Sequence, residues 1–238
     1  MSERKSTGSR KPAVKIAAPR LRAELEQVVF TPDEINDEDR LLDLAFEDLD
    51  LSDLVAEHVE LSGCRLTRCK LAGSELDKAI LVDLVLEHCD LANARWSDAA
   101  ATRVQVASSR LTGFAGPGIT LQHVTVRDSV LDFSSFRFAK FVRTEFTDCR
   151  LQSADFVSAD LSGTVFRRCD LTSAEFSQVT AKGAVFVDCT WEGARGIASL
   201  GGATIANSSP IDTLAVTLAM ASALDITLGD PAEFGSGE

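Results

Sequence analysis

A large apolar residue stands at nearly every fifth position of this chain between Leu41 and Gly196. Two unbroken runs share one register: Leu61, Leu66, Leu71, Leu76, Leu81, Leu86, Leu91 and Trp96, then Leu131, Phe136, Phe141, Phe146, Leu151, Phe156, Leu161, Phe166, Leu171 and Phe176. A period of five fits neither the two-residue alternation of a strand nor the 3.6-residue turn of a helix. A fixed repeat of this kind is typical of a solenoid, in which each unit buries its apolar face only by stacking on its neighbours.

Small side chains occur two positions before most of these large residues. The units Ala154–Ser158 and Ala159–Gly163 read Ala-Asp-Phe-Val-Ser and Ala-Asp-Leu-Ser-Gly. Both units resemble the A-(D/N)-L-x-x motif of the pentapeptide-repeat family. The resemblance implies an all-β protein, a right-handed quadrilateral β-helix with four pentapeptides in each coil. Nearly eight coils would then lie between Leu41 and Gly196, with the large and small residues pointing inward.

In such a helix, residues twenty positions apart should stack in columns of similar character. One column contains Leu51, Leu71, Leu91, Leu111, Leu131, Leu151, Leu171 and Trp191, and a neighbouring column contains Cys69, Cys89, Cys149, Cys169 and Cys189. Stacked Cβ atoms ~4.8 Å apart lie beyond the roughly 3.5–4.5 Å that a disulfide requires. We therefore predict an inward ladder of free, structural cysteines rather than a zinc or redox cluster, and a reducing cytoplasmic location.

The repeat is weakest between Ala101 and Leu121. Ala101 and Gly116 stand at positions that elsewhere hold large residues, while Phe114 stands where small residues are usual. We interpret Phe114 and Gly116 as an internal exchange of volume, in which the large ring fills the space that glycine leaves. The following Pro117-Gly118 pair predicts a local bend or bulge in the coil.

Composition divides the chain into five regions. We predict a basic flexible tail over 1–22, an acidic N-terminal cap over 23–40, the repeat β-helix over 41–205, a C-terminal helix over 206–228 and an acidic tail over 229–238. The cap is expected because a bare β-helix end would expose apolar surface and unpaired backbone.

The formal net charge of −12 is unevenly distributed. Between Glu24 and Glu60 there are fourteen acidic residues and one basic residue, Arg40. This excess has two interpretations that the sequence leaves open: a repulsive cap that prevents end-to-end stacking, or an acidic surface for a basic partner. The candidate acidic interaction surface comprises Asp43, Glu47, Asp48, Asp50, Asp53, Glu57 and Glu60. We also predict that the basic tail folds against this acidic segment.

A helix is predicted from about Pro210 to Ile226, because Ser209 can cap it and proline is favoured in its first turn. Its apolar stripe comprises Ile211, Leu214, Leu218, Ala221 and Leu224. The apolar run is too short to span a bilayer, so we expect no membrane association and predict burial by protein. The helix could cap the last coil or pair two copies of the chain, and the sequence leaves both open.

The C-terminal region also resembles the fluoroquinolone-resistance members of the pentapeptide-repeat family. That resemblance implies a homodimer paired tail to tail through the helix, a rod that mimics duplex DNA, and DNA gyrase or a related type II topoisomerase as the partner. Two alternatives remain: a scaffold for an unknown protein partner without DNA mimicry, and nucleic-acid contact through the basic N-terminal tail. We expect no direct DNA binding, because seven basic residues in 1–22 face a larger acidic excess nearby.

Sequence motifs for catalysis are missing. The chain has no G-x-S-x-G, Walker A, Rossmann or H-E-x-x-H pattern. We therefore predict no enzyme activity and no catalytic, metal-binding or cofactor-binding residues.

Overall fold

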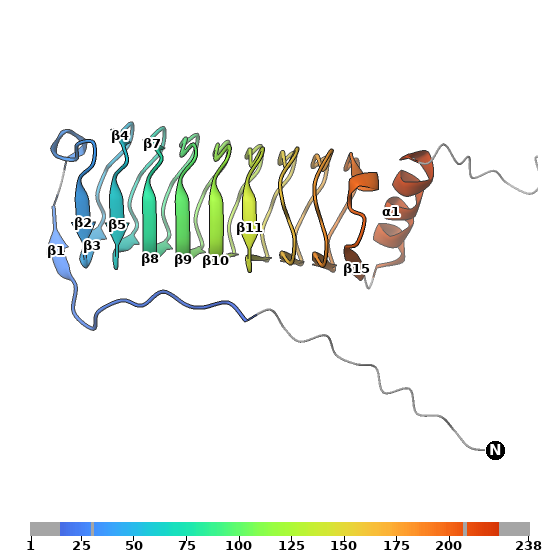
Figure 1. Cartoon of the computed structure of the whole chain (residues 1–238), viewed down its shortest axis with the longest axis horizontal. Coiled ribbons are helices and arrows are strands. Elements are labelled where there is room, and N and C mark those ends of the chain that lie inside the picture. Colours follow the sequence, from blue (N-terminus) through green and yellow to red (C-terminus); the bar gives the residue numbers. More distant parts are fainter. Residues whose placement is uncertain (1–14, 30, 207–208, 224–238) are drawn as a thin grey trace, which may run out of the picture.

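A computed structural model describes residues 15–29, 31–206 and 209–223, and it shows a rod of stacked coils with one helix across its C-terminal end (Figure 1). The rod is a right-handed quadrilateral β-helix of about 9 turns built from parallel strands. The predicted fold class is confirmed, with a further turn at the ends beyond the nearly eight coils inferred between Leu41 and Gly196.

One side of the rod carries the longest continuous sheet. In order along it lie β1 (Glu26–Val28), β3 (Leu44–Glu47), β6 (Arg65–Thr67), β8 (Ile80–Glu87), β9 (Ala100–Ala107), β10 (Thr120–Arg127), β12 (Glu145–Thr147), β13 (Val165–Arg167), β14 (Val185–Val187) and β15 (Thr204–Ala206). The adjoining side adds β2 (Arg40–Leu42), β5 (Glu60–Ser62) and β11 (Lys140–Val142), and a third side holds the pair β4 (Val55–Glu57) and β7 (Glu75–Asp77). Short 3-10 helices η1 (Pro32–Glu34) and η2 (Ile197–Ser199) lie near the two ends, and α1 (Pro210–Ala223) follows β15.

The twenty-residue register holds along the rod and shortens at both ends. Within the rod Phe46 pairs with Leu66, and Phe146 with Phe166. At the ends, however, Val28 pairs with Phe46 and Ile205 with Phe186, so the terminal turns contain 18 and 19 residues. The expected columns therefore exist, and the sequence period alone did not indicate the shorter terminal turns.

Aromatic rings stack in the C-terminal half of the core. Phe146, Phe166 and Phe186 form one column, with ring centroids 5.0 and 4.8 Å apart and ring planes within 6° of parallel. All three side chains are fully buried. This direct stacking of one ring on the next turn follows from the register, because identical side chains at n and n+20 point the same way along the bore.

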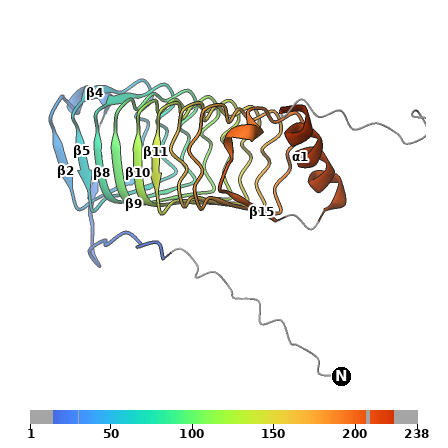
Figure 2. The ribbon, with the colours of Figure 1, turned by 45° about the vertical axis from the view of Figure 1, so that its right-hand side comes forward.

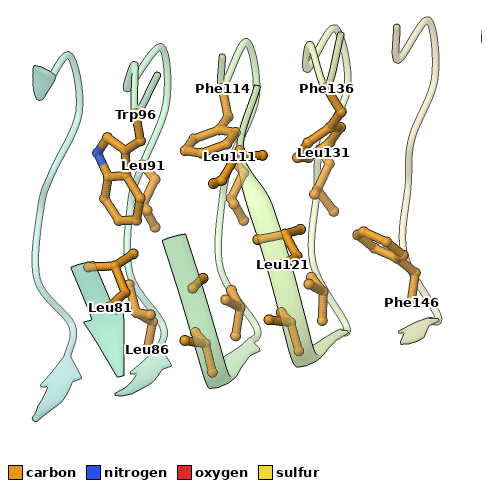
Figure 3. Close-up of a pocket in the computed structure, with 16 residues that line it drawn as sticks. Leu81, Leu86, Leu91, Trp96, Leu111, Phe114, Leu121, Leu131, Phe136 and Phe146 are labelled. Carbon is orange, nitrogen blue, oxygen red and sulfur yellow. The ribbon is translucent and has the colours of Figure 1, made fainter. Parts of the chain in front are cut away.

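The weak middle of the repeat contains a small void. An apolar cavity of about 50 Å³ lies in the bore (Figure 3), lined by residues that include Ala101, Leu121 and Phe136. Alanine at a position that usually holds a large residue leaves this space unfilled. Gly116 leaves no unfilled space, because a Cβ atom there would lie 3.0 Å from the Phe114 ring. The predicted exchange of volume between Phe114 and Gly116 is thus confirmed.

The predicted bend or bulge at Pro117-Gly118 is wrong. The Ile119 N–H donates to the Gly116 carbonyl at 3.2 Å, and the Gly118 N–H donates to the Arg137 carbonyl in the usual register. Gly118 adopts φ +70°, as residues do at the same point of other repeats. Proline and glycine here complete an ordinary tight turn, for which both residues are well suited.

A left-handed backbone conformation marks nearly every corner of the rod. The corner residue lies two positions after the large central residue, as in Asp48 with φ 57° and Gly63 with φ 68°. Glycine, asparagine and aspartate tolerate this conformation best. The five-residue period alone does not indicate this conformation, but the Gly, Asp, Asn and Ser residues repeated at these positions are a sequence signal of the turn.

The six cysteines are buried and form no disulfide with one another, as predicted. Each thiol donates to nearby backbone carbonyls: Cys64 Sγ lies 3.2 Å from the Leu41 oxygen, and Cys169 Sγ lies 3.5 Å from the Phe146 oxygen. The cysteines therefore act as small core residues that also satisfy carbonyl groups of the preceding turn.

Candidate interaction surfaces

The seven predicted acidic residues encircle the rod instead of gathering on one face. Asp43, Asp48 and Asp53 occupy three successive corners of one turn, and each has a left-handed backbone. Glu57 and Glu60 lie on β4 and β5, on the sides that complete the circuit. The structure therefore places this group as an acidic ring at the N-terminal end of the rod.

Most members of the acidic ring have cationic partners. Arg68 contacts both Glu47 and Asp48, with its Nε 2.7 Å from Asp48 Oδ1, and it lowers the pKa of the Asp48 carboxyl. The remaining pairs are Arg22–Asp43 at 3.0 Å, Lys70–Asp50 at 3.2 Å, Lys78–Glu57 at 3.8 Å and Arg40–Glu60 at 2.7 Å. Exposed pairs of this kind stabilise by at most about 1 kcal/mol each. Their main effect here is to reduce the negative potential of the ring.

Similar charge pairs extend along the rod because acids and bases alternate on stacked turns. Arg103 makes a two-point contact with Asp83 at 2.6 and 2.7 Å, and Arg110 does the same with Asp90 at 2.9 and 2.6 Å. The middle of the rod is thus electrically balanced, and it offers no continuous stripe of one sign.

Helix α1 presents an apolar outer face. Val216 is buried and belongs to the core cluster that includes Ile197 of η2 and Leu200. On the same helix Ile211 is 80% exposed and Leu214 is 56% exposed. Among the other predicted stripe residues, Leu218 is 47% exposed and Ala221 is partly buried, while Leu224 lies outside the described residues. Val216 therefore packs on the last coil, while the predicted stripe residues Ile211, Leu214 and Leu218 stay largely uncovered.

Two exposed phenylalanines form a candidate interaction surface that was not predicted from the sequence. Phe133 and Phe138 occupy two successive corners of one turn and are 67% and 65% exposed. Their φ angles are 57° and 59°, a conformation that is costly for a bulky residue. Large aromatic residues at corner positions, where the chain otherwise prefers small or polar ones, were the available signal.

An N-terminal strap lies along one corner of the rod. This strap, residues 15–22, runs back beneath the coils from β1 in both views (Figures 1 and 2). We call the column it follows the strap corner; it comprises Asp43, Gly63, Asp83, Arg103, His123 and Arg143. The strap reaches the acidic segment through the Arg22–Asp43 pair, and then continues past it to Asp83 and His123. Residues 1–14 of the predicted tail lie outside the described residues.

Two kinds of feature are missing from the described residues. In this part of the chain, no cluster of three or more His, Cys, Asp or Glu side chains could hold a metal ion. Within the same residues, no helix combines the length and the apolar character needed to cross a membrane.

The four-sided coil, the five-residue unit and the left-handed corners together define a β-solenoid of pentapeptide type. Residues 129–168 and 149–188 match the family model described as pentapeptide repeats, with eight copies. The chain is a pentapeptide-repeat protein.

Solved structures of similar fold include two pentapeptide-type proteins. Full-length QnrB1, a plasmid-mediated fluoroquinolone resistance protein, is 18% identical with a TM-score of 0.37, and the alignment covers 84% of this chain and 95% of that one. HetL, a pentapeptide repeat protein involved in heterocyst differentiation regulation from the cyanobacterium Nostoc sp. strain PCC 7120, is 17% identical with a TM-score of 0.28, and the alignment covers 66% of this chain and 89% of that one. At these values neither likeness supports a functional assignment. No curated protein sequence matches the chain.

Proposed function

We propose that this protein acts by binding other proteins, without catalysing a reaction, and that two copies associate through α1. The observation that carries the proposal is that one side of this helix packs on the core while apolar residues on its other side stay exposed. Val216 already covers the core, so Ile211, Leu214 and Leu218 are not needed for capping and stay exposed. Clustered apolar side chains on one element are typical of interfaces. A second copy of the same helix would bury them on both partners at once in a twofold arrangement.

Sedimentation equilibrium of the full chain tests this association. The expected mass at micromolar concentration is twice the protomer mass of 25.5 kDa. The double variant Leu214→Glu/Leu218→Glu should sediment as a monomer and keep the β-sheet circular dichroism of the rod. Thr213→Glu/Thr217→Glu is the matched control, because it adds the same two charges to the same helix at exposed polar positions. A monomeric wild-type chain would contradict the proposal and leave α1 as a cap alone.

The partner surface of the rod is best placed at the Phe133–Phe138 corner pair. Strain and exposure at the same two residues are unfavourable for an isolated rod, and aromatic side chains dominate the energetics of many protein interfaces. A pull-down from native extract should retain a protein on the wild-type chain that the variant Phe133→Ser/Phe138→Ser does not retain. Retention of the same protein by both chains would contradict this placement.

A narrower proposal is a DNA mimic that binds and modulates DNA gyrase or a related type II topoisomerase. The rod shape, the net charge of −12 and the resemblance of the C-terminal region support it. The ion pairs of the acidic ring weigh against it, because they lower the negative potential that a mimic of DNA needs. A gyrase supercoiling assay tests it. If micromolar protein neither inhibits gyrase nor protects it from a quinolone, this proposal is removed. Direct DNA contact by the tail is disfavoured, since Arg22 is already paired with Asp43.

We place the protein in the cytoplasm. Six cysteines with no disulfide among them favour a reducing compartment. Fractionation of the native cell with an antibody to the chain is the direct test.

A further inference from the structure

Three polar contacts fix the strap on the strap corner. The Ala17 N–H donates to His123 Nδ1 at 3.1 Å, and the Arg20 N–H donates to Asp83 Oδ1 at 2.9 Å. The third contact is the Arg22–Asp43 ion pair at 3.0 Å, in which the Arg22 side chain is largely exposed. The two backbone contacts therefore determine where the strap lies, and each depends on the ionisation state of a side chain in the rod.

The contact with His123 requires a neutral ring. Nδ1 can accept the Ala17 N–H only while it carries no proton, whereas both nitrogens of a protonated imidazole are donors. The charged groups that act on the ring from the neighbouring turns are Arg143 and Arg103. On the strap, Lys15 lies two residues from Ala17 in the sequence. Arg143 Nη1 lies 3.3 Å from His123 Nε2. In the described part of the chain, none of the groups acting on the ring is a carboxylate that would stabilise the protonated form.

We infer that His123 is a pH-sensitive latch: its neutral ring holds the Ala17 end of the strap against the rod, and protonation in mild acid releases that end. Protonation would turn the acceptor of the Ala17 N–H into a donor and would place a third positive charge beside two arginines. Release would uncover His123, which the strap now half-buries, beside the exposed Arg143 on the same corner.

The direction of the response follows from proton linkage. Burial, together with Arg143 and Arg103, lowers the pKa of His123 in the docked state below its ordinary value of about 6.5. Docking is therefore fully favoured above about pH 6.5 and weakens as the pH falls toward the docked pKa, by up to tenfold per pH unit. Asp83 behaves differently, because Arg103 lowers the pKa of its carboxyl and keeps it charged in mild acid. The Arg20 contact should thus persist while the Ala17 contact is lost.

Backbone NMR of the ¹⁵N-labelled full chain tests the latch. The ¹H–¹⁵N heteronuclear NOE of Ala17 should be high at pH 7.5 and fall sharply by pH 5.5, while that of Arg20 should stay high. In His123→Asn the Ala17 NOE should stay high at both pH values, because the asparagine amide oxygen can accept the same N–H and does not titrate. This variant should fold, since Asn93 already occupies an equivalent corner with φ 56°.

His88→Asn is the matched control. His88 is also a corner residue, with φ 57°, but it is on a different corner from the strap. Its substitution should leave the Ala17 profile like that of the wild type. An Ala17 NOE that does not change between pH 7.5 and 5.5 would overturn the inference. So would an equal loss of the Ala17 NOE in His123→Asn, because the titrating group would then be elsewhere.

Discussion

Filling the cavity beside Ala101 should stabilise the rod. Ala101 lies on β9, is buried, and lines the apolar void of about 50 Å³. Ala101→Val adds two methyl groups, and a β-branched side chain suits a strand. Residual voids cost ~24 cal/mol per Å³, so this one costs about 1.2 kcal/mol. We expect Ala101→Val to recover most of that, about 1 kcal/mol, which corresponds to a rise in Tm of roughly 2–4 °C for a domain of this size.

Differential scanning calorimetry of the full chain measures this effect, with Gly116→Ala as the contrasting variant. A Cβ atom at Gly116 would meet Phe114 at 3.0 Å and Ile119 at 3.1 Å, so an even smaller increase in volume meets filled space. Overpacking of this kind typically costs about 1–3 kcal/mol. The reasoning is refuted if Ala101→Val lowers Tm, or if the two substitutions shift Tm in the same direction.

Four further outcomes are expected. Phe166→Ala should cost about 3–5 kcal/mol, because it removes the middle ring of a buried stack; a guanidinium unfolding midpoint equal to wild type would contradict this. Phe133→Asn should raise Tm, since asparagine relieves a left-handed strain of about 1–2 kcal/mol and little burial is lost; a lower Tm would show that the ring packs on the rod. Arg103 lowers the pKa of the Asp83 carboxyl, so the contribution of this carboxylate to stability is present above about pH 4 and is lost as the pH falls below that value. When the urea midpoint of unfolding is measured against pH, Asp83→Asn should therefore show a smaller decrease below pH 4 than the wild type, and an equal decrease would refute this. No cysteine should react with Ellman's reagent before unfolding, since all six are buried and burial raises the pKa of Cys64; rapid labelling of the native chain would disprove it.

The core could be predicted because the period of the sequence matches the period of the structure. Once every fifth residue is apolar, stacking at n and n+20 determines which side chains meet, as for Phe146 and Phe166. The exchange between Phe114 and Gly116 was predictable for the same reason. Pro117-Gly118 misled the prediction, because these residues favour bulges and tight turns alike and the repeat already supplied a turn there.

The candidate surfaces were only partly predictable. Charge excess located the acidic ring, but its neutralisation depends on cations one turn away, such as Arg68 beside Asp48. The strap could not be placed from sequence, because Ala17 and His123 are 106 residues apart and no periodicity links them. The exposed face of α1 could not be predicted from the sequence, because apolar residues lie on several faces of the helix and only the fold places Val216 against the core.

Between its shorter terminal turns, the rod contains twenty residues in each turn and advances by one strand spacing per turn. Double electron–electron resonance between spin labels at Asp53→Cys and Ser173→Cys measures this directly. Both sites are exposed corner residues of one column, and the native cysteines are buried. Six turns of about 4.8 Å predict a backbone separation of about 29 Å between them. A narrow distance distribution near that value supports the account, and a separation of less than 20 Å or more than 40 Å, or a broad distribution, contradicts it.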